Sequence, residues 1–282
     1  STMNTEFAKG MALVLQPGVQ LSSTFAGHYD LAIYLAMILG FLAALLVFVK
    51  NRMAWGSFLV GFIALIWHFT QAGSRIAIFG LFFSVGLVCF LRRKFALGAL
   101  LLTIIIASIF TSPNLLRRIN NIIRVFESKS QSFVSVHPAL AAEDFGAVLA
   151  ETALRPIQQD VSTSIRFDVE WPRAMRSLYK NPFLGTGYSS ISLATDNEYL
   201  RALGETGLLG FVSFISILIA LGRGLKLRYQ KAKTNLDRIL TLSGLAIYSV
   251  FLISALFLDV FEASKIAILF WAFTGIAMST KS

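Results

Sequence analysis

The chain has 282 residues, of which 56% are hydrophobic and 14% are charged, and its mean hydropathy is +0.70. A water-soluble domain of this length could not hide that much apolar surface, so lipid must solvate a large part of the chain. The formal net charge of +10 does not indicate a nucleic-acid-binding protein, because that class presents a basic stripe with interleaved aromatic residues on a soluble domain.

Apolar runs long enough to cross a bilayer occur from residue 31 onward. A transmembrane helix needs roughly 20 mostly apolar residues, and residues 31–49 and 239–258 supply that length without a charge. Five shorter or weaker runs complete a pattern of about seven spans: 55–70, 76–91, 95–110, 208–222 and 266–278. The last of these also fits a buried or interfacial helix, because it is short. The sequence therefore predicts an all-α, polytopic bundle of transmembrane helices.

Lysine and arginine gather in three of the turns between these runs: Lys50 with Arg52, residues 92–94, and the strip 223–238. With seven spans, all three turns fall on one side of the membrane. The excess of positive charge in cytoplasmic loops identifies that side as the cytoplasm. The opposite side then receives residues 1–30, 71–75, 111–205 and 259–265.

This topology divides the chain into three parts. We expect residues 1–110 to hold an outer N-terminal segment and four spans, residues 111–205 to form a large extracytoplasmic loop with short helices and the site, and residues 206–282 to hold three spans. Within the loop, 114–126 has the pattern of an amphipathic helix at the membrane surface. A second helical pattern, 164–176, ends before Pro182. A glycine turn then leads to a new helix opened by residues 196–200, which would bring Arg166 near Asp196.

Neither a metal centre nor a cofactor site is predicted. The histidines lie on separate segments without ligand spacing, and the single cysteine, Cys89, lies inside an apolar run where a thiol acts as a small hydrophobe. The acidic pair Glu143 and Asp144 could in principle hold a divalent ion, but such a pair in a loop is usually solvated. The glycines of 204–210 lack the Gly-Lys-Ser/Thr of a phosphate loop, which favours close helix packing.

Several motifs occur in an order that resembles the O-antigen ligase and polymerase superfamily. They are Thr70-Gln-Ala-Gly-Ser-Arg75 at the outer end of a span, a helix with Arg166 and Trp171 that ends in Asn-Pro-Phe-Leu-Gly-Thr-Gly187, and Asp196-Asn-Glu-Tyr-Leu followed by Gly-Glu-Thr-Gly-Leu-Leu-Gly210. Residues 22–32 are similar to another family segment, so the resemblance covers most of residues 22–222. Family members usually carry further spans before this point. The resemblance therefore implies either a longer protein or an N-terminally shortened form.

The resemblance implies a metal-independent glycosyltransferase without a cofactor. Such an enzyme transfers a glycan from an undecaprenyl-pyrophosphate carrier to a hydroxyl of an acceptor glycan, glycolipid or protein, on the outer face of the bacterial cytoplasmic (inner) membrane. Its partners are these substrates and membrane lipids, and not nucleic acid. Guanidinium groups bind pyrophosphate oxygens in bidentate fashion and stabilise the charge that develops on the leaving group. This donor-binding role falls to Arg75 and Arg166.

The acceptor hydroxyl must lose its proton to a general base. Many family members place a histidine beside the asparagine of the third motif, whereas this chain has Asp196 there. Asp196 is therefore the first candidate for the base, and Glu198 and Glu205 are further candidates.

A structural interpretation stands beside each of these roles. Arg75 at the edge of a span could extend to the interface, and Arg166 could be a solvated helix residue. Asp196 is in a favourable position to cap the following helix, which is compatible with catalysis. Glu205 is costly so close to the membrane and therefore suggests function, but it also fits a packing polar group.

Two other function classes remain open. A transporter or flippase for lipid-linked or polymeric glycan would also be polytopic, but it tends to carry charges within its spans and paired repeats. Here the apolar runs are almost free of charge, and polar residues gather in one outward loop. A non-catalytic scaffold of the cell envelope is the third hypothesis, and it predicts that lysine is tolerated at Arg75 and Arg166.

Overall fold

The computed structural model describes residues 23, 25, 27–111, 166–191 and 195–280. Within these residues the chain forms eight α-helices, one short π-helical segment and no strand. The all-helical fold class is therefore confirmed. The amphipathic helix predicted at 114–126 and the acidic pair of the large loop lie outside the described residues.

Each of the seven predicted apolar runs corresponds to one helix. In chain order these helices are α2 (His28–Phe48), α3 (Arg52–Ala72), α4 (Arg75–Leu91), α5 (Phe95–Phe110), α10 (Glu198–Lys231), α11 (Asn235–Ser254) and α12 (Ser264–Ser279). By length and composition, α2, α3, α10 and α11 can cross a membrane. The other three have only 16 or 17 residues. Four candidate spans are thus established, and the total of seven stays a prediction.

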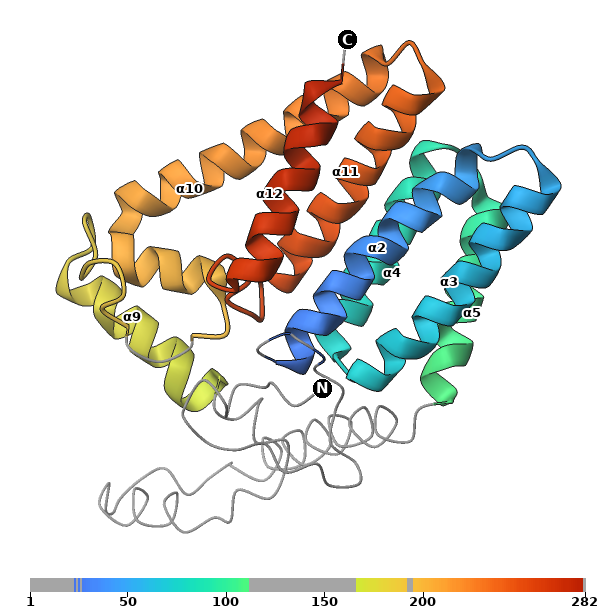
Figure 1. Cartoon of the computed structure of the whole chain (residues 1–282). Helices are drawn as coiled ribbons and strands as arrows, with labels where there is room; N and C mark the ends of the chain where they lie inside the picture. Colours follow the sequence, from blue (N-terminus) through green and yellow to red (C-terminus); the bar gives the residue numbers. More distant parts are fainter. Residues whose placement is uncertain (1–22, 24, 26, 112–165, 192–194, 281–282) are drawn as a thin grey trace, which may run out of the picture.

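Small residues bring the central helices together. α11 packs against both α2 and α4, and α3 and α5 flank this centre (Figure 1). The Ser84 hydroxyl of α4 donates to the Ala246 carbonyl of α11 at 3.0 Å. A Cβ atom at Gly40 of α2 would lie 2.8 Å from Ser84 Oγ. Only small side chains allow backbones this close, as is usual between helices in lipid.

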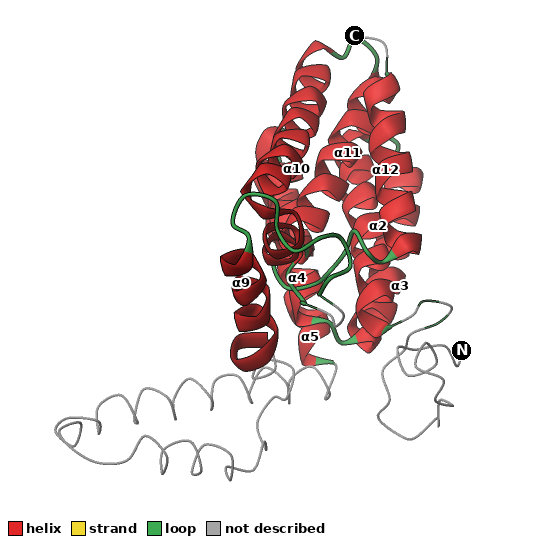
Figure 2. Ribbon diagram, turned by 90° about the vertical axis from the view of Figure 1, so that its left-hand side faces the viewer, coloured by secondary structure: helices red, strands yellow, loops and turns green. Residues whose placement is uncertain are grey.

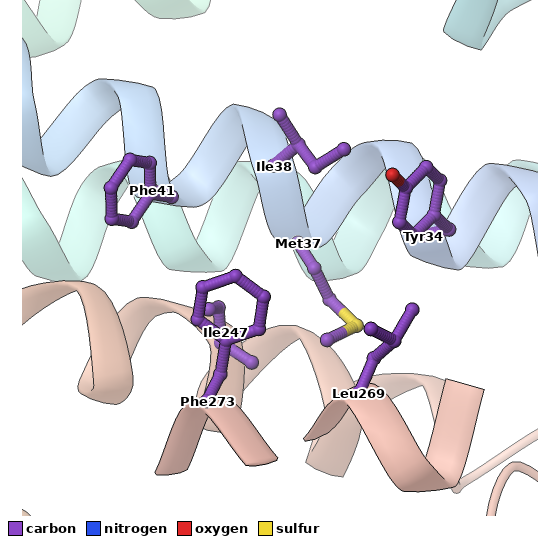
Figure 3. A pocket seen from close by; sticks show the side chains of 7 residues that line it. All are labelled: Tyr34, Met37, Ile38, Phe41, Ile247, Leu269 and Phe273. Atoms are coloured by element: carbon purple, nitrogen blue, oxygen red, sulfur yellow. The ribbon is translucent and has the colours of Figure 1, made fainter. Parts of the chain in front are cut away.

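The outward faces of the helices are apolar. Exposed large side chains occur on most of them, including Phe79, Phe83, Val212 and Ile268. A surface of this kind suits contact with hydrocarbon and is rarely found facing water. An apolar crevice of about 170 Å³ between α2, α11 and α12 has the same character (Figure 3), and its lining residues are Tyr34, Met37, Ile38, Phe41, Ile247, Leu269 and Phe273.

The two ends of the bundle differ in charge. The turns α2–α3, α4–α5 and α10–α11, which carry the predicted basic residues, lie together at the end near the C-terminus (Figure 1). The turns α3–α4 and α11–α12 lie at the opposite end, together with α9 (Trp171–Lys180) (Figures 1 and 2). The structure thus separates the basic turns from the predicted site, while the side of the membrane that each end faces stays a prediction.

Candidate active site

The helical pattern predicted before Pro182 is present as two consecutive segments. A π-helical turn, η1, spans Arg166–Glu170 and continues directly into α9. Trp171 joins this unit to the bundle, because its ring centroid lies 4.5 Å from that of Phe167 and 6.2 Å from that of Phe257 near the end of α11. The start of α9 is therefore held against the α11–α12 turn.

The glycine turn after α9 packs against a kink in α10. Gly207 has φ 65° and ψ −169°, which interrupts the helix, and Figure 1 shows the bend. The Leu208 N–H donates to the Pro182 carbonyl at 2.9 Å, and the Gly187 N–H donates to the Glu205 carbonyl at 2.9 Å. A Cβ at Gly207 would lie 2.4 Å from the Phe183 carbonyl oxygen. Close helix packing is confirmed for Gly204, where a Cβ would lie 2.8 Å from the Ala174 carbonyl oxygen of α9, whereas Gly207 packs against the turn and has a positive φ.

Arg166 and Asp196 meet across this turn, as the sequence predicted. Asp196 Oδ2 lies 2.9 Å from Arg166 Nε and 2.7 Å from Nη2, and the arginine side chain is only 6% exposed. Asp196 has φ 49°, a left-handed conformation that turns the backbone just before α10. The interpretation of Asp196 as the helix cap is wrong. Asn197 is the cap instead, because its Oδ1 accepts the Leu200 N–H at 3.0 Å.

Asp259, which follows α11, organises the backbone on both sides of Asp196. Its carboxylate accepts the Thr195 N–H at 2.9 Å, the Asn197 N–H at 3.1 Å and Arg201 Nη1 at 3.0 Å. Sequence pattern alone does not single out this residue. Its position directly after the apolar run 239–258, on the predicted outer side, was the available signal.

Arg201 was also missed, and it joins three carboxylates. Besides Asp259, its Nε lies 3.4 Å from Glu205 Oε1 and 3.6 Å from Glu262 Oε1. Glu262 in turn accepts the Tyr188 hydroxyl at 3.2 Å. The spacing of Arg201 and Glu205 by four residues on one helix was a sequence signal for this pair.

The two remaining base candidates have different surroundings. Glu198 is the first residue of α10, is buried, and accepts the Phe261 N–H at 3.0 Å. It therefore fixes the α11–α12 turn to the start of α10. Glu205 is 2% exposed and faces Arg201 just before the kink. Both carboxylates line the cleft between α10 and Tyr188, in company with Arg201.

Arg75 lies at the same end of the bundle on α4. Gly73, with φ 65°, ends α3, and the Ser74 hydroxyl caps α4 by accepting the Ala77 N–H at 3.3 Å. This turn makes Arg75 the first residue of α4, half-buried. Its joint action with Arg166 on one ligand stays a prediction.

The carboxyl groups beside Arg166 hold their protons more tightly than usual. Burial raises the pKa of Asp196, the Arg166 guanidinium lowers it, and the like charge of Asp259 raises it further, so the net direction is upward. Burial also raises the pKa of Glu170 to about 7, with the charges of Asp196 and Asp259 adding to the effect against Arg166 and Arg173. Shifts of this origin gather at functional sites.

The described residues hold no evident metal-binding site. Among the described residues, no three His, Cys, Asp or Glu side chains are grouped as a metal site requires. Metal independence remains a prediction.

A family model described as O-antigen ligase matches residues 60–215, which is more than half of the chain. The match includes Arg75, Arg166 and the whole motif from Asp196 to Gly210. The chain belongs to the O-antigen ligase family. The predicted resemblance is thereby confirmed. A search of curated proteins finds no significant match.

As a member of the O-antigen ligase family with apolar membrane helices, the protein is a bacterial membrane protein of polysaccharide and lipopolysaccharide biosynthesis. The family consists of ligases and polymerases that process lipid-linked glycans and join them to acceptors. Membership therefore supports a glycosyltransferase-like enzyme over a transporter or a scaffold.

Proposed function

We propose that this O-antigen ligase family protein transfers a glycan from an undecaprenyl-pyrophosphate carrier to an acceptor hydroxyl, without a metal ion, on the outer face of the cytoplasmic membrane. The observation that carries the proposal is the contact between the buried Arg166 and the partly buried Asp196, at the end of the bundle away from the basic turns. A cation for the leaving group and a carboxylate for the acceptor proton are here in direct contact.

Arg166 is suited to bind the pyrophosphate. Its guanidinium is planar and permanently charged, and it can donate two parallel hydrogen bonds to phosphate oxygens. The donor must then compete with Asp196 for this group, since Nε and Nη2 both face Oδ2. Arg75 supplies a second cation from α4, so that the negative charge on both phosphates is stabilised as the glycosidic bond breaks.

Release of Asp196 from Arg166 prepares the base. Once Arg166 turns to the pyrophosphate, the Asp196 carboxylate takes the proton of the acceptor hydroxyl. The acceptor oxygen attacks the anomeric carbon, the bond from that carbon to the phosphate oxygen breaks, and undecaprenyl pyrophosphate leaves with the electron pair. Donor binding thus comes before activation of the acceptor. Glu198 and Glu205 are the reserve candidates, although Glu198 already accepts a backbone N–H and Glu205 already faces Arg201.

The test is glycan transfer by the purified chain in liposomes, with an undecaprenyl-pyrophosphate-linked donor and no added metal. Arg75→Lys and Arg166→Lys should each lower turnover by at least about 100-fold, because lysine cannot make the bidentate contact. Arg223→Lys, an exposed residue at the opposite end, is the matched control and should retain the wild-type rate. A non-catalytic scaffold predicts no sugar transfer by the wild type or by any of these variants, and a transporter predicts donor movement across the liposome without sugar transfer.

A further inference from the structure

A small cleft lies beside the kink of α10, between this helix and the Tyr188 loop. It has a volume of about 170 Å³, and its walls include Tyr188, Arg201, Glu205, Thr206, Phe214 and Glu262. The cleft is distinct from the Arg166–Asp196 contact, since neither of those residues lines it. Its size suits one sugar ring.

Two polar atoms in this cleft lack hydrogen bonds among the described residues. Glu205 Oε1 and Arg201 Nε are both buried and unsatisfied, and the 3.4 Å between them is an ion pair without hydrogen-bond geometry. Glu262 Oε1 is 3.6 Å from the same nitrogen. A buried donor or acceptor without a partner costs about 1–3 kcal/mol. These atoms are therefore arranged for a ligand that both accepts from the guanidinium and donates to a carboxylate.

A hydroxyl group has this dual capacity. Each hydroxyl is one donor and two acceptors, so a single oxygen can accept from Arg201 Nε while donating to Glu205. Phosphate oxygens cannot do so when ionised, because they only accept. The charges agree with this choice, since one guanidinium in the cleft is surrounded by Asp259, Glu205 and Glu262, and the excess negative charge repels an anion.

Aromatic side chains supply the rest of a sugar-binding surface. Phe214 lines the cleft, and Tyr188 is held at its rim by the hydrogen bond from its hydroxyl to Glu262. An aromatic ring with a polar tip can cover the apolar C–H face of a sugar and still reach water. Pockets of this type combine apolar walls with a few placed polar groups.

The cleft is linked to the proposed base through Asp259. Arg201 Nη1 and the backbone N–H groups on both sides of Asp196 all donate to this one carboxylate. A ligand that contacts Arg201 is thereby placed in the same hydrogen-bonded unit as Asp196.

We infer that this cleft is the acceptor subsite, in which Arg201, Glu205 and Glu262 bind the hydroxyls of one sugar ring of the acceptor. The inference rests on the proposed transfer reaction and adds to it the place and chemistry of acceptor recognition. The anionic donor and the neutral acceptor sugar then bind on opposite sides of Asp196.

Steady-state kinetics test this assignment, with the water-soluble core oligosaccharide released from lipopolysaccharide as the acceptor probe. Glu205→Gln keeps the size of the side chain but replaces an acceptor oxygen by a donor. It should raise the acceptor KM at least about tenfold, as loss of one charge-assisted hydrogen bond implies, and leave the donor KM unchanged. Asp237→Asn, which removes a carboxylate at the other end of the bundle, is the control and should change neither KM.

A binding measurement separates this inference from the proposed function. Ala202 lines the cleft, and Cys89 is buried, so maleimide labelling of Ala202→Cys reports on the cleft alone. The core oligosaccharide should slow this labelling and should not slow labelling of Ser190→Cys, an exposed position outside the lining. Protection without any transfer by the wild type would support the cleft and reject the proposed reaction. Transfer by the wild type with no protection and an unchanged acceptor KM in Glu205→Gln would overturn the inference alone.

Discussion

The guanidinium of Arg166 contacts the carboxylate of Asp196 across 30 positions of sequence, with Nε and Nη2 at 2.9 and 2.7 Å from the same oxygen. Asp196 adopts φ 49° in this contact, which directs its side chain to the arginine and leaves helix capping to the next residue. A non-glycine residue in this conformation costs of order 1–3 kcal/mol and persists only where surrounding contacts hold it. Here those contacts come from Asp259.

Substitution at positions 196 and 197 distinguishes chemistry from helix capping. Asp196→Asn removes the proposed base but keeps the shape, so turnover should fall by roughly 10²–10⁴-fold while donor affinity stays equal or rises, because Arg166 loses its competitor. Asn197→Ala removes the cap and should lower the free energy of unfolding by about 1 kcal/mol. Single-turnover rates, donor binding and thermal unfolding of both variants in detergent measure these effects. Equal losses of turnover at the two positions would contradict a catalytic Asp196.

Local sequence patterns predicted the helices because each one depends on a continuous apolar run or a turn signal. The 31–49 run became α2, and the Gly185–Gly187 turn brought Arg166 to Asp196. The cap was misassigned because aspartate and asparagine are both good caps, and the choice depends on whether the helix begins at residue 197 or 198.

Asp259 and Glu262 could not be placed from the sequence in the same way. Their partners are 58 to 74 positions away, and such contacts depend on how α11 packs against α10. Periodicity predicts which face of a helix is apolar but not its register against a distant helix. The site is therefore predictable where it is built from one local turn, and unpredictable where the α11–α12 turn completes it.

Glu170 should give donor binding a pH dependence near neutrality. Its pKa is raised to about 7, so it is neutral below that pH and anionic above it, beside the groups proposed to bind pyrophosphate. The donor KM should therefore rise as the pH increases through about 7. In Glu170→Gln the side chain stays neutral, and the rise should be lost while turnover at pH 6 is retained.

The same group also affects stability. A carboxyl whose pKa is raised on folding stabilises the native state below its unfolded pKa, and this contribution is lost as the pH rises through the folded pKa. The midpoint temperature of thermal unfolding of the wild type should thus fall as the pH rises from about 4.5 to 7. In Glu170→Gln this part of the fall should be absent. A common pH profile for both proteins would show that another group is responsible.

Removal of the Asp259 carboxylate should displace the backbone around Asp196, although Asp259 is not proposed to contact the substrate. In Asp259→Ala, two backbone N–H groups and the Arg201 guanidinium lose their acceptor, at a cost of roughly 1–3 kcal/mol for each group left buried. We expect turnover to fall by at least about 100-fold, with a smaller loss in Asp259→Asn, which keeps one acceptor oxygen. Asp237→Asn serves as the control for a lost negative charge. Wild-type turnover in a folded Asp259→Ala would show that the 195–197 backbone holds its conformation unaided.

Gly207, like Gly185 of the turn that packs against it, is a position at which the site tolerates no side chain. Its φ of 65° and ψ of −169° lie in a region that is essentially restricted to glycine, and a Cβ would approach the Phe183 carbonyl oxygen to 2.4 Å. Gly207→Ala should lose about 1–3 kcal/mol from backbone strain alone, and relief of the clash would move the Pro182–Gly187 turn and with it the start of the cleft. Gly86→Ala is the matched control, because a Cβ there has no neighbour within 4 Å and alanine favours the helix. The midpoint temperature of thermal unfolding and the transfer rate should both fall in Gly207→Ala and stay at wild-type values in Gly86→Ala. An active, stable Gly207→Ala would mean that the kink is not required to shape the site.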